Sequence, residues 1–211
     1  MKIENFYCKI NEEDYEKLYI VSDTHFGHGK IINFANRHVF SGVSDMNRTM
    51  IENWNDHVSN DDYVLFLGDF AWDKPKYLGK YLDSLNGKII FIRGNHDLNF
   101  HEYYEEHSPK NIYAYLPYLE LDLKFIQKYV CLFHYPQIDW NRKFHGSYHF
   151  YGHVHINELY PDFIEKKLNV GVDNFARING FNKEDYRPYK LKNVIELIDN
   201  AQDYIKSLRL K

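Results

Sequence analysis

The run LYIVSDTH, residues 18–25, joins four apolar residues directly to a short polar loop. A short apolar run that ends so abruptly is typical of a buried strand that delivers polar residues at its C-terminal end. Asp23 and His25 stand two positions apart, and in an extended chain this spacing points both side chains to the same side. The same pair also occurs in ordinary surface turns, so its meaning depends on the rest of the chain.

Two further apolar runs end in the same way. Residues 63–67 (YVLFL) lead into Gly-Asp at 68–69, and residues 88–92 (KIIFI) lead into RGNHD at 93–97. In open α/β sheets, sites form at the carboxyl ends of the strands, so we expect these loops to converge. A β-turn would explain the glycine and asparagine of the loop at 93–97, but not the histidine and aspartate that follow them.

The second half of the chain is richer in expected strands. Residues 129–133 lead into His134, residues 149–151 lead into GHVH at 152–155, and a further strand is expected at 168–172. His134 alone would be an ordinary structural histidine at a strand end. The two histidines of GHVH are separated by one residue, which on an extended segment presents both imidazoles on one face, as a bidentate metal clamp requires.

Helices are expected between and after these strands. Residues 45–58 place apolar side chains at helical spacing, with Asp45 as the N-cap. Residues 75–85 are expected to be helical, with a proline at a permitted first-turn position. Residues 191–210 predict a C-terminal helix on the body of the protein. With no linker or repeat, the chain is expected to form one domain.

Composition favours an ordinary folded protein. The apolar share is 44%, which argues against disorder, and 26 basic against 30 acidic residues give a formal charge of −4. This balance supplies no overall basic field for a nucleic-acid backbone, although 18% aromatic residues leave a base-stacking surface open. Cys8 and Cys131 form no CxxC pair, and with no signal peptide or membrane-spanning run they predict reduced thiols in a soluble, cytoplasmic protein.

The polar residues of the five loops form a set that suits metal ions. It combines imidazoles with oxygen donors: Asp23, His25, Asp69, Asn95, His134, His153 and His155. Such a mixture suits Mn²⁺, Fe, Zn²⁺ or Ni²⁺ better than the all-oxygen sites of Ca²⁺ or Mg²⁺. There are too many donors for one tetrahedral zinc, and enough for two ions that share one carboxylate.

The five blocks together resemble the signature of the calcineurin-like metallophosphoesterase superfamily. They occur in its order: D-x-H at 23–25, G-D at 68–69, G-N-H-D at 94–97, His134, and G-H-x-H at 152–155. The likeness is strongest to small bacterial and phage-type phosphoesterases that begin S-D-T-H-F-G-H, and it continues into residues 168–172. It implies an α/β fold, an α/β/β/α sandwich of two facing mixed sheets flanked by helices, in a single domain over residues 1–211.

The resemblance also implies a role for each residue of the set. The first metal ion would be bound by Asp23, His25 and His155, the second by Asn95, His134 and His153, and Asp69 would bridge both. His96 would not bind metal but would face the scissile phosphate, as general acid or as stabiliser of the leaving oxygen. Asp97 would orient the imidazole of His96.

One departure from the family pattern bears on the substrate. In the protein phosphatases of the superfamily an arginine soon after G-D grips the phosphate, whereas residues 70–73 here are FAWD. We therefore expect a smaller substrate or a diester. The candidates for contact with the substrate's phosphate, each equally readable as an ordinary surface residue, are His28, Arg142, Lys30 and Arg37. The stretch 140–149 is either a rim that selects substrate or a solvated loop, and Arg93 is expected to be structural.

The predicted function is hydrolysis of a phosphodiester or a small phosphomonoester by a hydroxide that bridges two divalent ions, with Mn²⁺ the favoured metal. Two other classes stay open. One is a nuclease of the same superfamily acting on single-stranded nucleic acid, which the acidic balance disfavours. The other is a non-catalytic scaffold that binds proteins, which the retention of every ligand position and of His96 disfavours. Membrane binding is not expected, and the oligomeric state does not follow from the sequence.

Overall fold

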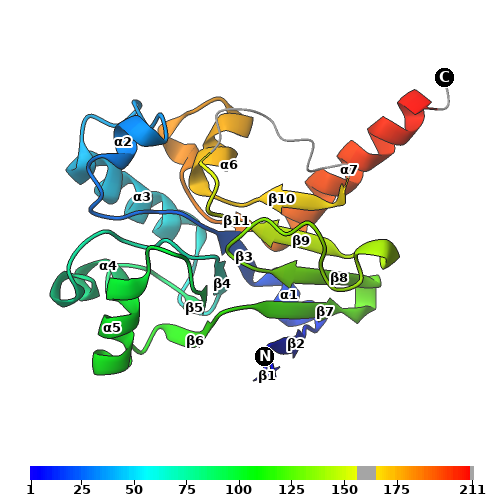
Figure 1. Cartoon of the computed structure of the whole chain (residues 1–211), viewed down its shortest axis with the longest axis horizontal. Helices are drawn as coiled ribbons and strands as arrows, with labels where there is room; N and C mark the ends of the chain where they lie inside the picture. Colours follow the sequence, from blue (N-terminus) through cyan, green and yellow to red (C-terminus); the bar gives the residue numbers. More distant parts are fainter. Residues whose placement is uncertain (156–164, 210–211) are drawn as a thin grey trace.

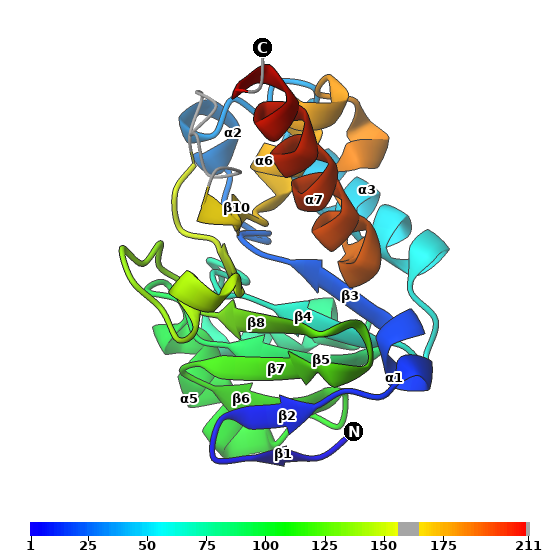
Figure 2. The ribbon, with the colours of Figure 1, turned by 90° about the vertical axis from the view of Figure 1, so that its right-hand side faces the viewer.

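Two β-sheets pack face to face in this computed structural model, which describes residues 1–155 and 165–209 (Figures 1 and 2). The first sheet has five strands. Four of its strands are parallel, and three of these are the apolar runs expected at 18–21, 63–67 and 88–92. A short antiparallel strand closes one edge. The order across this sheet is β11 (Tyr189–Lys190), β3 (Leu18–Val21), β4 (Tyr63–Phe66), β5 (Lys88–Ile92) and β6 (Ile112–Leu116).

The second sheet has six strands and mixes parallel with antiparallel pairs. The order is β1 (Ile3–Glu4), β2 (Tyr7–Lys9), β7 (Leu119–Leu123), β8 (Lys128–Leu132), β9 (Tyr148–Tyr151) and β10 (Lys167–Asn169). The parallel pairs are β2 with β7, β8 with β9 and β9 with β10. The antiparallel pairs are β1 with β2 and β7 with β8. The expected sandwich of two facing mixed sheets is confirmed.

Apolar residues fill both faces of the five-stranded sheet. In β3, Leu18 and Ile20 join the core between the sheets, whereas Tyr19 and Val21 join the core under the helices. A strand buried on both faces needs apolar residues at every position, and all four residues of β3 are buried. This is why the sequence shows an unbroken apolar run here instead of an alternating one.

Seven α-helices in the described residues flank the two sheets. Three of them cover the outer face of the five-stranded sheet, through residues such as Met50, Trp54 and Phe100: α3 (Val43–His57), α4 (Gly79–Leu82) and α5 (Leu98–His107). The long C-terminal helix runs beside β3 in Figure 2 and adds Val194 and Ile198 to the core between the sheets. The others are α1 (Glu12–Glu16), α2 (Ile31–Phe34), α6 (Val172–Asn179) and α7 (Leu191–Arg209).

Short 3₁₀ turns complete the elements, and two expectations about helices are corrected. The 3₁₀ turns are η1 (Pro75–Tyr77), η2 (Lys124–Ile126), η3 (Lys143–His145) and η5 (Lys183–Asp185). The helix expected at 75–85 is therefore two short pieces, η1 and α4. Asp45 is not an N-cap, because α3 begins two residues earlier, after Gly42. The Asp45 carboxylate instead lies in the first turn and accepts a hydrogen bond from Ser41 N at 3.0 Å.

Two further boundaries differ from the sequence-based expectation. The strand expected at 168–172 is β10, which ends at Asn169, and Val172 already opens α6. The C-terminal helix was expected to run to Leu210, which lies outside the described residues. None of the helices within the described ranges is long and apolar enough to cross a membrane.

Candidate metal centre

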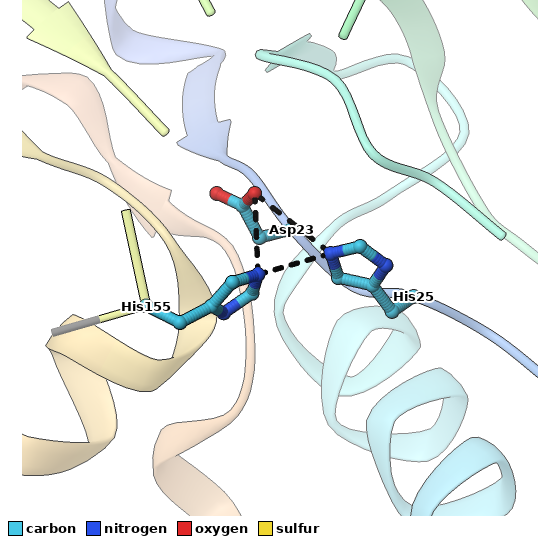
Figure 3. Close-up of side chains that lie close together, drawn as sticks. All are labelled: Asp23, His25 and His155. Atoms are coloured by element: carbon cyan, nitrogen blue, oxygen red, sulfur yellow. Dashed lines mark hydrogen bonds and ion pairs between the residues drawn. The ribbon is translucent and has the colours of Figure 1, made fainter. Parts of the chain in front are cut away.

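The predicted ligands gather into two neighbouring clusters. In each cluster the three side chains place a potential ligand atom within 4.8 Å of the others. The first cluster consists of Asp23, His25 and His155, whose side chains point toward one another (Figure 3). The second cluster consists of Asp69, His134 and His153. The sequence-based assignment had placed these six residues at two ions in the same grouping, with Asp69 shared.

The ligands arrive from both sheets. The loops after β3 and β4 bring the carboxylates, and the loops after β8 and β9 bring three of the four histidines. Backbone hydrogen bonds hold neighbouring loops together: Asp23 N donates to Gly68 O at 2.9 Å, and Gly152 N donates to His134 O at 2.9 Å. Across the two sheets, His153 N donates to the Asp23 carboxylate at 3.0 Å. The clusters therefore lie where loops of the two sheets meet.

Asp69 lies between the two clusters. Its Oδ2 is 3.6 Å from Nε2 of His25 in the first cluster and 3.5 Å from Nε2 of His134 in the second. Its other oxygen, Oδ1, accepts a hydrogen bond from His96 N at 2.9 Å. The side chain is thus held by the backbone through one oxygen while the other faces both sets of histidines, as a carboxylate shared by two cations requires.

Asn95 completes the second cluster. Its Oδ1 is 2.9 Å from Nε2 of His134 and 2.8 Å from Nδ1 of His153. The opposite ring nitrogen of His134, Nδ1, is 2.6 Å from the carbonyl oxygen of Leu67, so Nδ1 carries the proton and Nε2 offers its lone pair to the centre. An amide oxygen and two imidazole nitrogens thus converge on one point beside Asp69.

The first cluster crowds two ring nitrogens together. Nε2 of His25 and Nε2 of His155 are 3.1 Å apart. Nδ1 of His155 is 2.8 Å from the Asp173 carboxylate, which only accepts hydrogen bonds, so Nδ1 carries a proton. When neither Nε2 atom carries a proton, a cation between them would bind both lone pairs, and the donor set therefore fits a metal ion.

Burial sets the charge of the first cluster. It raises the pKa of the Asp23 carboxyl, and it lowers the pKa of His25 well below the ordinary value, with the Arg37 guanidinium acting in the same direction. Burial also lowers the pKa of His155, but the hydrogen bond to Asp173 and the charge of Asp23 outweigh it, so the net shift is upward. A neutral His25 is in the form that binds metal, and a buried carboxylate such as Asp23 is stabilised by a cation.

The sequence had suggested that Arg37 contacts a phosphate or is an ordinary surface residue, and the structure corrects both expectations. Its side chain is fully buried and forms a two-pronged ion pair with Asp173, Nε to Oδ1 at 2.7 Å and Nη2 to Oδ2 at 2.9 Å. It also donates to the carbonyl oxygens of Asp23 and Thr24 at 2.7 and 2.8 Å. Arg37 therefore ties the backbone of the D-x-H loop to the carboxylate that orients His155.

Asp173 is a candidate site residue that the sequence did not reveal, because it contacts both His155 and Arg37. Burial would raise its pKa, but the Arg37 charge and the hydrogen bond from His155 hold the pKa below the ordinary value. A carboxylate that accepts the distal N–H of a metal-ligating histidine fixes the ring and raises its basicity. The only signal in the sequence is an acid just after the last apolar run.

Asp97 does not orient His96, and this assignment is corrected. Both of its oxygens accept backbone hydrogen bonds, from Asp69 N at 2.8 Å, Phe70 N at 2.9 Å and Gly94 N at 2.7 Å. The side chain is fully buried, and burial together with the nearby charge of Asp69 raises its pKa to about 6. Asp97 thus joins the two loops that carry Asp69 and Asn95, and its contribution is to their position.

The two histidines of GHVH do not clamp one ion together. His153 belongs to the second cluster and His155 to the first. The segment is not extended at this point, because His153 has a φ of 69°. The alternation that would place both rings on one face is lost there, and the separation of the two rings agrees with the family assignment instead.

His96 and His28 both lie beside the first cluster. The His96 ring is exposed, and its centroid is 5.8 Å from that of His25 and 4.9 Å from that of Trp72. The buried His28 ring stacks on Trp72 with the centroids 4.3 Å apart. Both histidines line a cleft of about 680 Å³ that also includes Lys30. His28 and Lys30 therefore stay candidates for contact with a substrate.

Arg142 lies elsewhere. Its guanidinium sits 4.5 Å from the centroid of the Tyr129 ring, and it lines a separate hollow that includes Tyr7 and Asp122. The stretch 140–149 is only partly a surface loop, because His149 is fully buried. Neither the position of Arg142 nor that of His149 agrees with a role in contacting a phosphate at the two clusters.

Comparisons with known proteins agree with this geometry. The family described as Calcineurin-like phosphoesterase superfamily domain matches residues 17–171. An uncharacterized protein of Methanocaldococcus jannaschii, MJ1445, is 37% identical over 193 residues, which covers 88% of this chain and 93% of the relative. A crystal structure of a protein of unknown function from Aquifex aeolicus, AQ665, has a TM-score of 0.63 at 24% identity and covers 85% of this chain and 98% of its own, which is a likeness of fold. Because the family match covers residues 17–171, the chain belongs to the calcineurin-like phosphoesterase superfamily of metal-dependent phosphoesterases.

Proposed function

We propose that the chain hydrolyses a phosphodiester or a small phosphomonoester at a centre of two divalent cations that share Asp69. The observation that carries the proposal is the position of Asp69 Oδ2, which is 3.6 Å from a histidine nitrogen of one cluster and 3.5 Å from a histidine nitrogen of the other. A single ion would need only one of these clusters. Two ions held close together need a carboxylate between them to offset their repulsion.

The donors favour Mn²⁺, with Fe, Zn²⁺ and Ni²⁺ as alternatives, because imidazole and carboxylate or amide oxygens are mixed at both positions. The first ion would be held by Asp23, His25 and His155, and the second by Asn95, His134 and His153. When bound, such a pair of ions neutralises the phosphate oxygens and makes a water molecule acidic enough to supply a nucleophile near neutral pH.

His96 is the proposed acid of the reaction. In the net step a water oxygen bonds to phosphorus, the bond from phosphorus to the leaving oxygen breaks, and its electron pair stays on that oxygen. The protonated imidazole of His96 donates a proton to the leaving oxygen, and the proton lost by water restores the acid form afterwards. His96 suits this role because its ring is exposed beside the first cluster while its backbone N–H holds Asp69 at 2.9 Å.

The test uses metal-stripped full-length protein reconstituted with Mn²⁺, and measures hydrolysis of bis-p-nitrophenyl phosphate against the monoester. Asp69→Asn is expected to lose bound metal and activity together. His96→Ala is expected to keep both ions and to lose about 10²–10⁴-fold in kcat for a basic leaving group. The exposed His57, at the end of α3, provides the matched control His57→Ala, which should behave as the unsubstituted protein.

The leaving group separates proton donation from a merely structural role of His96. A phenyl ester has a more basic leaving oxygen than a p-nitrophenyl ester, so it depends more on the acid. The deficit of His96→Ala should therefore be larger for the phenyl diester than for the p-nitrophenyl diester. If protein shown to hold two ions cuts neither diester nor monoester, hydrolysis of a small ester is wrong, and either a larger substrate or a scaffold role takes its place.

A further inference from the structure

The cleft beside the first cluster carries more aromatic surface than a bare phosphate needs. One side of this cleft of about 680 Å³ is formed by metal-centre residues, His25, His155 and His96. The lining also includes Phe34, at the end of α2, and Trp72, whose ring centroid is 4.9 Å from that of His96. Phe34 is 67% exposed and Trp72 is 49% exposed, so both rings are available to a bound molecule.

Trp72 is held in place for such a contact. Its backbone N–H donates to the carbonyl oxygen of Phe26 at 2.8 Å, and its indole stacks on the ring of His28 with an interplanar angle of 12°. His28 itself is 9% exposed, and its Nδ1 is buried with no hydrogen-bond partner among the described residues. With His28 stacked on the indole and His96 beside it, Trp72 is still 49% exposed and lines the cleft.

The lining of the cleft indicates what it would bind. Phe34 and Trp72 supply aromatic surface, and Lys30 at the same cleft supplies a positive charge. No carboxylate is among the described residues that line it. Aromatic side chains stack on planar rings regardless of the ring's hydrogen-bonding pattern, and a cleft of this volume matches a ligand the size of a mononucleotide. The chain's formal charge of −4 supplies no overall basic field for a long strand.

We propose that this cleft binds a planar heteroaromatic ring of the substrate, the base of a mononucleotide-sized phosphodiester, with Trp72 and Phe34 as the residues that select it. The inference rests on the proposed function, because it places the ester phosphate at the two clusters and the ring next to them. Stacking on an aromatic side chain is worth about 5- to 150-fold in affinity for each base.

A matched pair of cyclic phosphodiesters isolates the ring. Adenosine 2′,3′-cyclic phosphate and glycerol 1,2-cyclic phosphate carry the same five-membered diester, and only the first has a base. With Mn²⁺-loaded full-length protein, kcat/KM for the nucleotide should exceed that for the glycerol ester by about 5- to 150-fold. In Trp72→Ala and in Phe34→Ala the ratio of the two values should fall toward one.

Conservative and distant variants sharpen the result. Trp72→Phe keeps a ring that can stack and should retain part of the ratio, whereas Trp72→Leu keeps apolar bulk alone and should lose it. Phe144 is 90% exposed and is not among the residues that line this cleft, so Phe144→Ala should leave the ratio unchanged. A loss of the ratio in Phe144→Ala equal to that in Phe34→Ala would overturn the assignment to this cleft.

Calorimetry provides a readout that does not depend on turnover. AMP should bind the Mn²⁺-loaded protein about 5- to 150-fold more tightly than ribose 5-phosphate, and Trp72→Ala should remove most of the difference.

Equal hydrolysis of the two cyclic esters, with equal binding of the two phosphates, overturns the ring site and leaves the proposed function standing. If neither cyclic ester is cut although bis-p-nitrophenyl phosphate is, the proposed function stands and the nucleotide substrate is overturned; if none of the three is cut, the proposed function fails and calorimetry alone decides the ring site. Cleavage of single-stranded oligonucleotides but not of the cyclic nucleotide overturns the mononucleotide-sized substrate.

Discussion

Four non-glycine residues of the candidate metal centre have a backbone conformation with positive φ. Asp23, His25, Asp69 and His153 have φ values of 60°, 50°, 59° and 69°. Such conformations are uncommon for residues other than glycine and cost of order 1 kcal/mol or more each. They persist because loops from two sheets and their hydrogen bonds hold them. These strained conformations orient the side chains of the two clusters, and they lower the stability of the fold by the cost of the strain.

The chain of contacts from Arg37 through Asp173 to His155 leads to the first prediction. Asp173→Asn removes the charge that orients His155, so the affinity of the first metal position for Mn²⁺ should fall by about 10- to 100-fold. Titration calorimetry on metal-stripped protein measures this. The second position, which Asp173 does not touch, should keep its affinity within about threefold.

Stability is separated from metal binding by a double variant. Asp173→Asn alone leaves the buried Arg37 charge without its anionic partner, which should destabilise the fold by about 3–5 kcal/mol. Combining it with Arg37→Met removes both charges and should restore part of the stability, while the metal affinity stays low. An unaltered first-site affinity in folded Asp173→Asn would show that this contact does not position the ligand.

At this scale the sequence predicts ligands better than it predicts the residues that support them. Each ligand stands in a short contiguous motif, so a motif such as GNHD identifies Asn95 from its neighbours. Arg37 and Asp173 are 136 positions apart, and no local pattern connects them. Asp97 stands beside His96 in the sequence, but its side chain is directed to the backbone of another loop.

At the scale of elements, the strands were easier to predict than the helices. The unbroken apolar runs of β3, β4 and β5 follow directly from burial on both faces. The expected helix at 75–85 is divided at Leu78, which follows η1 and precedes α4, and Gly79 opens α4. A Cβ at this glycine would lie 2.7 Å from the hydroxyl of Tyr103 in α5, so a helix from elsewhere in the chain packs closely at this point. Periodicity along one segment contains no information about such a neighbour.

Strand β9 holds a buried histidine that should make stability depend on pH. The ring nitrogens of His149 are 3.2 Å from Cys131 O and 3.1 Å from Gln137 N, and burial lowers its pKa from 6.5 to about 4. Below pH 6.5 His149 binds a proton in the unfolded chain but not in the folded protein. The free energy of unfolding therefore decreases as the pH falls toward 4. The loss attributable to His149 between pH 7 and pH 5 should be about 2 kcal/mol.

Urea unfolding in EDTA at several pH values measures this loss. His149→Gln can keep an acceptor for Gln137 N but cannot be protonated, so its stability should fall by about 2 kcal/mol less than that of the unsubstituted protein over the same interval. His57→Gln changes an exposed histidine of α3 and should follow the unsubstituted protein. The same pH dependence in His149→Gln and in the unsubstituted protein would exclude His149 as its source.

At the scale of the whole molecule, the centre joins the two sheets. Carboxylates from loops of the five-stranded sheet meet histidines from loops of the six-stranded sheet. The convergence of the loops after β3, β4 and β5 could be predicted because sites form at the carboxyl ends of strands in open α/β sheets, and the part played by the other two loops was implied by the resemblance. The facing arrangement of the sheets was predicted from the resemblance, because strand patterns alone do not state which sheet a strand joins.

Because ions bind only the folded arrangement of these loops, metal should stabilise the whole fold. At a free Mn²⁺ concentration about 100 times the dissociation constant, each bound ion adds about 2.7 kcal/mol. For a chain of this size that raises Tm by about 5–10 °C relative to EDTA in thermal unfolding. Ca²⁺ should give a smaller shift because it prefers oxygen donors, and Asp69→Asn should lose most of the Mn²⁺ effect. Equal shifts with Mn²⁺ in Asp69→Asn would place the stabilising ion elsewhere.

The shared position of Asp69 is tested most directly by anomalous diffraction from crystals grown with Mn²⁺. Two anomalous peaks should appear about 3.5–4 Å apart, one beside Asp23, His25 and His155 and the other beside Asn95, His134 and His153, with the Asp69 carboxylate between them. A single peak at saturating Mn²⁺, or two peaks that do not share Asp69, would contradict a two-metal centre.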